Sequence, residues 1–121
     1  MTKEEFIGVL EEKGWDKEEY IILAGGSLLL RGIRKETSDL DLAFSDELAR
    51  KVNLSRYSKT SQGTYKLDKN IEAVGNMEYF DYDMVDGFKC QSLGQILSYK
   101  RKRLLPKDIQ DMWAIQNYLG K

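Results

Sequence analysis

An apolar, β-prone run at residues 20–24 stops abruptly at Gly25, Gly26 and Ser27, and this junction constrains the fold more than any other part of the sequence. An apolar run followed by glycines predicts a strand that ends in a sharp turn, and the leucines after Ser27 predict a short helix that begins at this serine. Two glycines let the backbone approach a ligand without a Cβ atom in the way. A serine that opens a helix can offer its hydroxyl and free amides to phosphate oxygens, so the junction is suited to a triphosphate.

Eleven residues separate the serine from a second strand pattern at residues 39–44, where polar and apolar residues alternate. This period of two predicts a strand with one buried face and places Asp39 and Asp41 together on the other face, about 6.5 to 7 Å apart. Two such carboxylates can jointly hold divalent cations that bridge phosphate oxygens. Two-metal chemistry commonly uses a third carboxylate on a neighbouring strand, and Glu72, in the strand expected at residues 71–74, is the best placed candidate.

Composition narrows the functional classes. The chain has 121 residues, which favours a single domain over residues 1–121. Its 19 basic and 20 acidic residues nearly cancel, which argues against the positive field of a dedicated nucleic-acid binder.

There is no histidine to activate the single cysteine, Cys90, so we expect it to be a small buried apolar residue rather than a nucleophile. The absence of a secretory signal pattern and of a long apolar run predicts a soluble, cytoplasmic protein without a membrane partner.

The remaining patterns predict an α+β fold in which helices pack on one small mixed sheet. Thr2 and Glu5 have the spacing of a capping box, and Asp86-Gly87 is a hairpin signal. The stretch at residues 53–63 is the most loop-like. Further helices are expected at 2–14, 46–52, 92–103 and 106–120, the last with Ile109, Met112, Trp113 and Ile115 on its apolar side, and further strands at 64–67, 71–74, 79–85 and 88–91.

Each motif also has an ordinary structural explanation. Gly-Gly-Ser is common in turns, and an Asp-x-Asp strand edge often only keeps a surface soluble. The combination is more specific, because an apolar strand that leads into the glycines and a second strand that carries the aspartates form the context that a metal and triphosphate site needs.

Two segments add a family resemblance. Residues 22–44 resemble the signature of the polymerase-beta-like nucleotidyltransferase superfamily, and look most like the small branch that includes the AbiEii-type toxins of abortive-infection systems. Residues 92–100, Arg103 and residues 106–112 resemble the lysine-bearing helix and the following helix of that branch. Together these segments cover about half of the chain. The resemblance implies the nucleotidyltransferase fold, a small mixed sheet with helices packed on it.

The resemblance also implies roles for individual residues. Lys100 would reach toward the triphosphate or the acceptor, although it is also one of four consecutive basic residues that would suit a solvated helix face. The spacing of Asp108 and Asp111 favours a structural role in caps and in ion pairs with Lys107 or Arg103. The implied phosphate-binding residues are Gly25, Gly26 and Ser27, and the implied catalytic metal ligands are Asp39, Asp41 and, at the third acidic position, Glu72.

The leading interpretation is therefore an enzyme that depends on Mg²⁺ or Mn²⁺ and transfers a nucleoside monophosphate from ATP or another nucleoside triphosphate to a hydroxyl group. The acceptor class stays open between a small molecule, an RNA such as tRNA, and a protein, as in a toxin–antitoxin pair. Expected protein partners are a second copy of the chain or an antitoxin. The alternative is a catalytically degenerate module that binds nucleotides or a partner without turnover, and a purely structural protein is a third interpretation.

Overall fold

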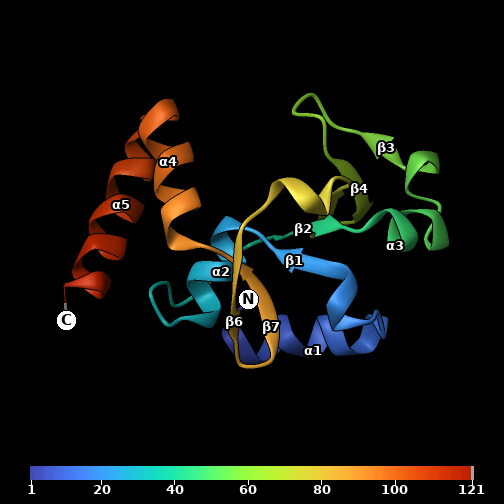
Figure 1. The fold of residues 1–121 in the computed structure, drawn as a ribbon, viewed down its shortest axis with the longest axis horizontal. Coiled ribbons are helices and arrows are strands. Elements are labelled where there is room, and N and C mark those ends of the chain that lie inside the picture. The colour runs from blue at the N-terminus through green and yellow to red at the C-terminus, as the bar shows by residue number, and fades with distance from the viewer. Residues whose placement is uncertain (121) are drawn as a thin grey trace.

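A seven-stranded mixed sheet runs through the computed structural model, which describes residues 1–120 (Figure 1). The strands lie in the order β3-β4-β5-β2-β1-β7-β6. The predicted α+β class, with one small mixed sheet and helices packed on it, is confirmed at this level. The strands are β1 (Tyr20–Ile22), β2 (Leu40–Phe44), β3 (Ser58–Lys59), β4 (Tyr65–Asp68), β5 (Ile71–Val74), β6 (Tyr82–Val85) and β7 (Phe88–Gln91).

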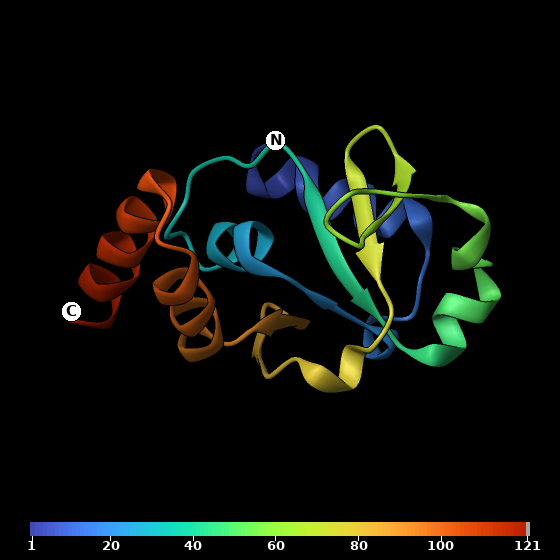
Figure 2. The same ribbon diagram turned by 90° about the horizontal axis from the view of Figure 1, so that it is seen from above.

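Five α-helices and three short 3₁₀ turns connect the strands. α1 lies along one side of the sheet, whereas α4 and α5 form a pair at one end of the molecule (Figures 1 and 2). None of the helices within residues 1–120 is both long and apolar enough to cross a membrane. The helices are α1 (Lys3–Lys13), α2 (Ala24–Leu30), α3 (Asp46–Lys51), α4 (Leu93–Arg103) and α5 (Pro106–Leu119), and the 3₁₀ turns are η1 (Lys17–Glu19), η2 (Leu54–Arg56) and η3 (Met77–Tyr79).

Strand pairing determines which side chains meet at the centre of the sheet. β2 pairs with β1 in the antiparallel sense and with β5 in the parallel sense, and β1 pairs with β7 in the parallel sense. In the β2–β5 pairing Asp41 lies directly opposite Glu72. Because side chains alternate along a strand, these two carboxylates share one face of the sheet, while Leu40 and Leu42 point to the other.

The main core fills the face of the sheet that α1 covers. Phe6 and Leu10 of α1 pack there against buried residues of the central strands, including Cys90, which is fully buried as expected for a small apolar residue. A second, smaller core joins α2 to the helical end of the molecule and consists of Leu28, Leu93, Ile96, Leu97 and Ile115. The pocket described below opens on the face of the sheet away from α1.

Most helix ends follow their local signals. Thr2 and Glu5 form the predicted capping box, and Gly14 ends α1 in the left-handed conformation. Asp86 and Gly87 both have positive φ, as a tight hairpin turn between β6 and β7 requires. The loop expected at residues 53–63 also contains η2 and β3. The local sequence does not predict β3, because this strand exists through its pairing with the more distant β4.

The start of α2 differs from the prediction. The helix begins at Ala24 after Leu23, not at Ser27, so the two glycines lie within its first turn. Gly26 is buried, and a Cβ atom there would lie 2.5 Å from Cζ of Phe6 and 2.6 Å from Cγ2 of Ile22. The absence of a side chain at Gly26 is therefore required by the contact of α2 with α1 and β1.

This contact predicts an asymmetry between glycines. Gly26→Ala is expected to lower the free energy of unfolding by about 1–3 kcal/mol, because the added methyl group overpacks a filled core. Gly8→Ala is the matched control, since nothing lies within 4 Å of a Cβ atom there and alanine favours the interior of α1. Urea unfolding of both variants measures the difference. Equal stability of the Gly26→Ala variant and the wild type would contradict the tight packing.

The final helix also differs from its predicted apolar face. Met112 and Ile115 pack inward against α2 and α4, whereas Ile109 is 45% exposed and Trp113 is 69% exposed. The sequence pattern merged two faces of α5 because it cannot tell which apolar residues have a neighbouring element. Among the described residues, another element packs against only one side of α5.

Candidate functional site

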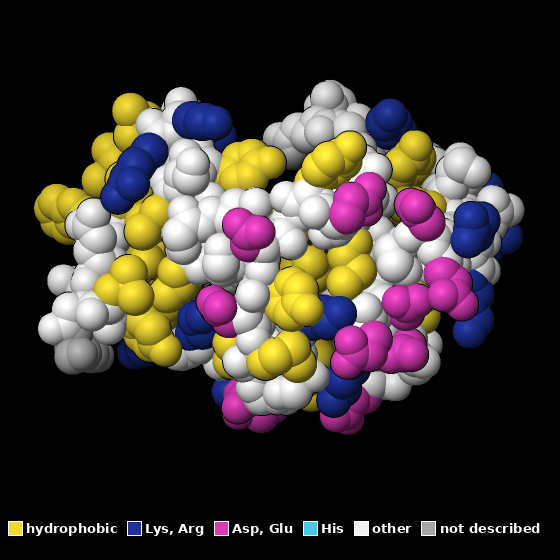
Figure 3. Space-filling model, viewed as in Figure 1, with side chains coloured by type: hydrophobic (Ala, Val, Ile, Leu, Met, Phe, Trp, Pro, Cys, Tyr) yellow, Lys and Arg dark blue, Asp and Glu magenta, His cyan; other side chains and the backbone are white. Residues whose placement is uncertain are grey.

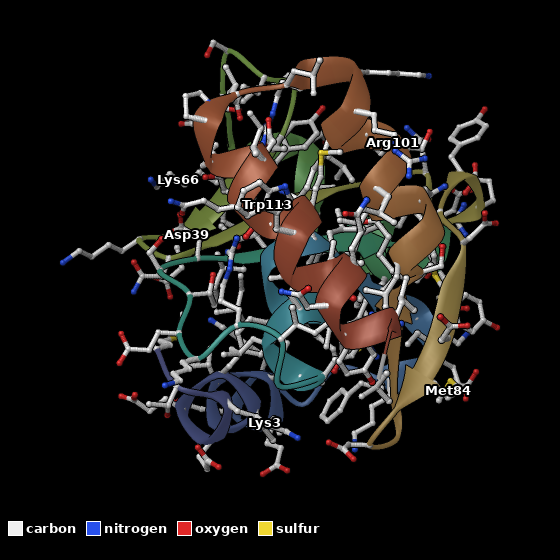
Figure 4. All side chains as sticks on the ribbon, turned by 90° about the vertical axis from the view of Figure 1, so that its left-hand side faces the viewer. Lys3, Asp39, Lys66, Met84, Arg101 and Trp113 are labelled. Carbon is white, nitrogen blue, oxygen red and sulfur yellow. The ribbon has the colours of Figure 1, made fainter. Side chains whose placement is uncertain are left out.

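A row of polar side chains crosses the sheet on the face away from α1. Glu72 of β5 lies between Asp41 of β2 and Lys66 of β4 in the strand register, and Ser58 of β3 lies beyond Lys66. Asp39 immediately precedes β2, two residues from Asp41. Figure 4 shows Asp39 and Lys66 on the same side of the molecule, far from Met84 on β6. The structure thus brings Asp41 and Glu72 together, with Asp39 at the end of the same strand face.

A pocket of about 350 Å³ opens over this row. Asp41 and Glu72 lie on its sheet side, and Lys100 and Arg103 of α4 lie on its helical side. The surface is hollowed between α4 and the β3–β4 segment (Figure 3). The other lining residues are Leu23, Ala24, Gln62, Thr64, Val74, Phe80, Gln91, Ile96 and Tyr99.

The carboxylates of the row are electrostatically crowded. Burial raises the pKa of Asp41 to about 6, and the negative charges of Glu72 and Asp39 add to this effect, while Lys107 opposes it. Glu72 is held in place by the Thr64 hydroxyl, which donates a hydrogen bond of 2.5 Å to its Oε1. A cation bound here would relieve the repulsion that Asp41 experiences.

The chemistry of these donors fits the divalent ion that the resemblance implies. Hard cations such as Mg²⁺ and Mn²⁺ prefer carboxylate oxygens, and three acidic residues lie on one strand face and its neighbour. Within residues 1–120, however, no three acidic, cysteine or histidine side chains gather closely enough to hold one ion in their present rotamers. Asp39 instead accepts a hydrogen bond from the Ser38 hydroxyl. Binding by all three carboxylates would therefore need at least one side chain to rotate.

The glycine-serine segment is placed differently from the expectation. The Ser27 side chain is fully buried, and its hydroxyl donates a 2.7 Å hydrogen bond to the backbone carbonyl of Gln91. Arg31, one turn later, donates to the Ser27 hydroxyl and to the same carbonyl. In this arrangement the hydroxyl links α2 to β7, so it is not presented to the pocket.

Gly25 remains the glycine that faces other polar groups. A Cβ atom there would lie 3.0 Å from Nη1 of Arg34 and 3.1 Å from Oγ1 of Thr37. Arg34 in turn pairs with Asp111 at 2.6 Å. Gly25 therefore leaves room for a guanidinium group beside the start of α2, at the edge of the pocket that Ala24 lines.

Lys100 belongs to a buried ion network. Its side chain is 8% exposed and pairs with Asp111 at 2.9 Å and with Asp108 at 3.3 Å, so the alternative of a solvated helix face is wrong. Arg103 pairs with Asp108 at 2.6 Å, as the spacing of these residues predicted. With Arg34, the network holds three cations and two carboxylates, so it keeps one net positive charge beside the pocket.

Asp108 is the centre of this network. Hydrogen bonds from Arg103, from the Leu105 amide and from Lys100 hold the pKa of the Asp108 carboxyl well below its usual range, although its burial acts in the opposite direction. Its bond to the Leu105 amide also caps α5. The predicted structural role of Asp108 and Asp111 agrees with these contacts, although the pairing with Lys107 is not among the ion pairs of the described residues.

Comparison with known proteins does not identify the family. The chain matches no protein-family model, no curated protein and no solved structure.

Several polar residues of the site were not expected from sequence. Gln91 is buried; its Oε1 accepts a hydrogen bond from the Ala24 amide, and its Nε2 donates to Gln95. Thr64 orients Glu72, and Arg34 reaches Asp111 from a loop. The one local signal was Gln91 at the end of the strand predicted at residues 88–91, because a polar side chain must find a hydrogen-bond partner when it is buried.

The pKa of Asp41 predicts how stability depends on pH. Its carboxyl titrates near pH 6 in the folded chain and near about 4 when unfolded, so its contribution to stability is complete below about pH 4 and is lost as pH rises through 6. The Asp41 carboxyl should therefore add up to about 2 kcal/mol to the stability of the metal-free protein between neutral pH and about pH 4.5. Urea unfolding with a chelator present measures this slope. The Asp41→Asn variant should lack this contribution, and an unchanged slope would show that another group causes it.

Proposed function

We propose that this chain is a nucleotidyltransferase that uses Mg²⁺ or Mn²⁺ and transfers a nucleoside monophosphate from a nucleoside triphosphate to an acceptor hydroxyl. The observation that carries the proposal is the pairing of Asp41 with Glu72 in a pocket whose opposite side carries Lys100 and Arg103. A metal–triphosphate complex has a cationic part that suits the carboxylates and an anionic part that suits the basic side. The family resemblance of residues 22–44 supports the same assignment.

In the proposed reaction the acceptor oxygen forms a bond to the α-phosphorus, and the bond from that phosphorus to the bridging oxygen of pyrophosphate breaks. The acceptor proton passes to a carboxylate of the row, and pyrophosphate leaves. When bound, the divalent ion would neutralise phosphate charge and help to align the acceptor oxygen. Asp39, Asp41 and Glu72 are the residues that would hold it. The positive side of the pocket would stabilise the leaving pyrophosphate.

The inactive alternative also has a specific observation in its favour. Ser27 and Lys100, two residues to which the resemblance assigns contacts with phosphate or acceptor, are both engaged by protein groups. A chain that retains the pocket without these contacts would bind nucleotide and fail to transfer it. In this alternative the chain is a module whose function depends on nucleotide binding without nucleotide transfer.

Calorimetric titration tests the shared premise of both functions. ATP, GTP, CTP and UTP are titrated with Mg²⁺ into the wild type and into the Asp39→Asn, Asp41→Asn double variant. We expect Mg²⁺-dependent binding of at least one nucleotide to the wild type and none to the double variant. Glu36→Gln is the matched control, since Glu36 is exposed and does not line the pocket. Failure of every nucleotide to bind the wild type would reject the proposal. If a nucleotide binds, an assay of pyrophosphate release with a mixture of RNA, protein and small-molecule acceptors distinguishes the enzyme from the non-catalytic module.

A further inference from the structure

The outer side of α4 and α5 carries an apolar surface that no other element of residues 1–120 covers. Leu105, Ile109 and Trp113 lie at intervals of four residues, so they form one stripe along α5. Trp113 is 69% exposed, and Figure 4, which looks onto this end, shows it on the outer side of the helix. We call this stripe, together with the exposed Arg101 and Lys102 of α4, the helical-end face. Other large apolar side chains exposed at the same end are Tyr99, Leu104, Tyr118 and Leu119.

The exposed charged residues of α4 and α5 have one sign. Arg101, Lys102 and Lys107 are exposed and make no ion pair within the described residues, whereas Asp108 and Asp111 are held in the buried network. The sequence from residue 93 onward has six basic and two acidic residues, so the preceding part has 13 basic and 18 acidic residues of the chain's 19 and 20. Figure 3 shows the same division, with acidic side chains gathered away from α4 and α5. The helical-end face is therefore both apolar and positively charged.

We propose that the helical-end face binds an acidic amphipathic helix of a partner protein. Aliphatic and tryptophan side chains at intervals of four residues match the apolar stripe of such a helix. Arg101 and Lys102 of α4 would then meet an acidic flank of that helix. This interaction is independent of the proposed nucleotide site, because Trp113 and Ile109 do not line the pocket.

The same observations disfavour other occupants. Two copies that met through this face around a twofold axis would place one basic cluster against another. RNA would gain contacts with the basic residues and one stacking plane at Trp113, but Leu105 and Ile109 offer neither a stacking plane nor a hydrogen bond to a base. The stripe is also flanked by the neutral amides of Gln110 and Gln116, which suit hydrogen bonds to a folded polypeptide better than insertion into a bilayer.

The test uses a synthetic helix of about 20 residues with leucine on one face and glutamate on the flanks. Fluorescence anisotropy of the labelled peptide measures its binding to the full chain. We expect micromolar binding that weakens at least about 10-fold in the Trp113→Ala variant. The Arg101→Glu, Lys102→Glu double variant should weaken it similarly and reduce its salt dependence. Met84→Ala, at an exposed apolar residue of β6, is the control that should leave binding unchanged.

Two control peptides and two competing ligands make the test decisive. A peptide of the same composition in scrambled order and one with lysine in place of glutamate should both bind much more weakly. Equal binding of either peptide, or an unchanged affinity of both Trp113→Ala and Ile109→Ser, would overturn the proposal. Trp113-dependent binding of single-stranded RNA or phosphatidylserine vesicles that displaces the acidic peptide would also overturn it, as would a Trp113-dependent dimer in sedimentation. Circular dichroism checks that each variant is folded.

Discussion

Glu72→Gln is expected to lower the rate of nucleotide transfer at least about 100-fold while changing nucleotide affinity much less. The glutamine keeps the size of the side chain and can still accept the hydrogen bond from Thr64, but it loses the charge beside Asp41. If the carboxylate binds the metal or takes the acceptor proton, its neutralisation removes an interaction that is strongest in the transition state. Single-turnover kinetics of pyrophosphate release, together with calorimetric binding, measures the two effects separately.

The control for this variant is Glu78→Gln, which changes an exposed glutamate of η3. An enzyme in which Glu72→Gln transfers nucleotide at the wild-type rate would remove Glu72 from the catalytic set and leave Asp39 and Asp41 to be tested alone. A wild type that binds nucleotide and never transfers it would favour the degenerate module instead.

Asp108→Ala is expected to cause the largest loss of stability of any single change discussed, about 3 kcal/mol. The side chain is fully buried, and its removal leaves the buried ammonium of Lys100 with one remaining partner, Asp111. It also removes the cap of α5 at the Leu105 amide. The value is at the lower end of the range for breaking a buried ion pair, because Arg103 is half exposed and can turn to water.

Urea unfolding at neutral pH measures this loss, and Glu18→Ala provides the comparison. Glu18 pairs with Lys89 at 3.1 Å but is 73% exposed, so its loss should cost less than about 1 kcal/mol. Similar small losses in both variants would show that the network around Asp108 does not anchor α5. Lys100→Met should then be neutral as well, which is a second check on the same conclusion.

The elements with strong local signals were predicted well. The capping box at Thr2 and Glu5 is formed, and the Ser92 hydroxyl accepts from the Gln95 amide to begin α4. These predictions succeed because a cap or a tight turn depends on residues within one turn of each other. The predicted start of α2 was wrong because Gly26 was interpreted as part of a turn. In the structure Gly26 lies within the helix, where the packing of α2 against Phe6 leaves no room for a side chain.

The candidate site was predicted in composition but not in arrangement. The sequence marked Asp39, Asp41 and Glu72, yet only the parallel pairing of β2 with β5 makes Asp41 and Glu72 neighbours. The role expected of the Ser27 hydroxyl depended on a helix start that lies three residues earlier, and it is engaged by the Gln91 carbonyl. Strand pairing and buried hydrogen bonds join distant segments, so a local pattern cannot specify them.

By itself the sequence determined which residues alternate along β2, where α1 and α4 begin, and that the chain has acidic and basic parts. Those properties follow from periods, caps and composition, which are local. Only the tertiary structure decided that Lys100 is buried between two aspartates, where a solvated face had been one of two alternatives, and that Trp113 is exposed, where the sequence pattern had placed it on the apolar side. The reason is that burial depends on which distant element covers a side chain: α5 covers Lys100, and within the described residues no element covers the outer side of α5.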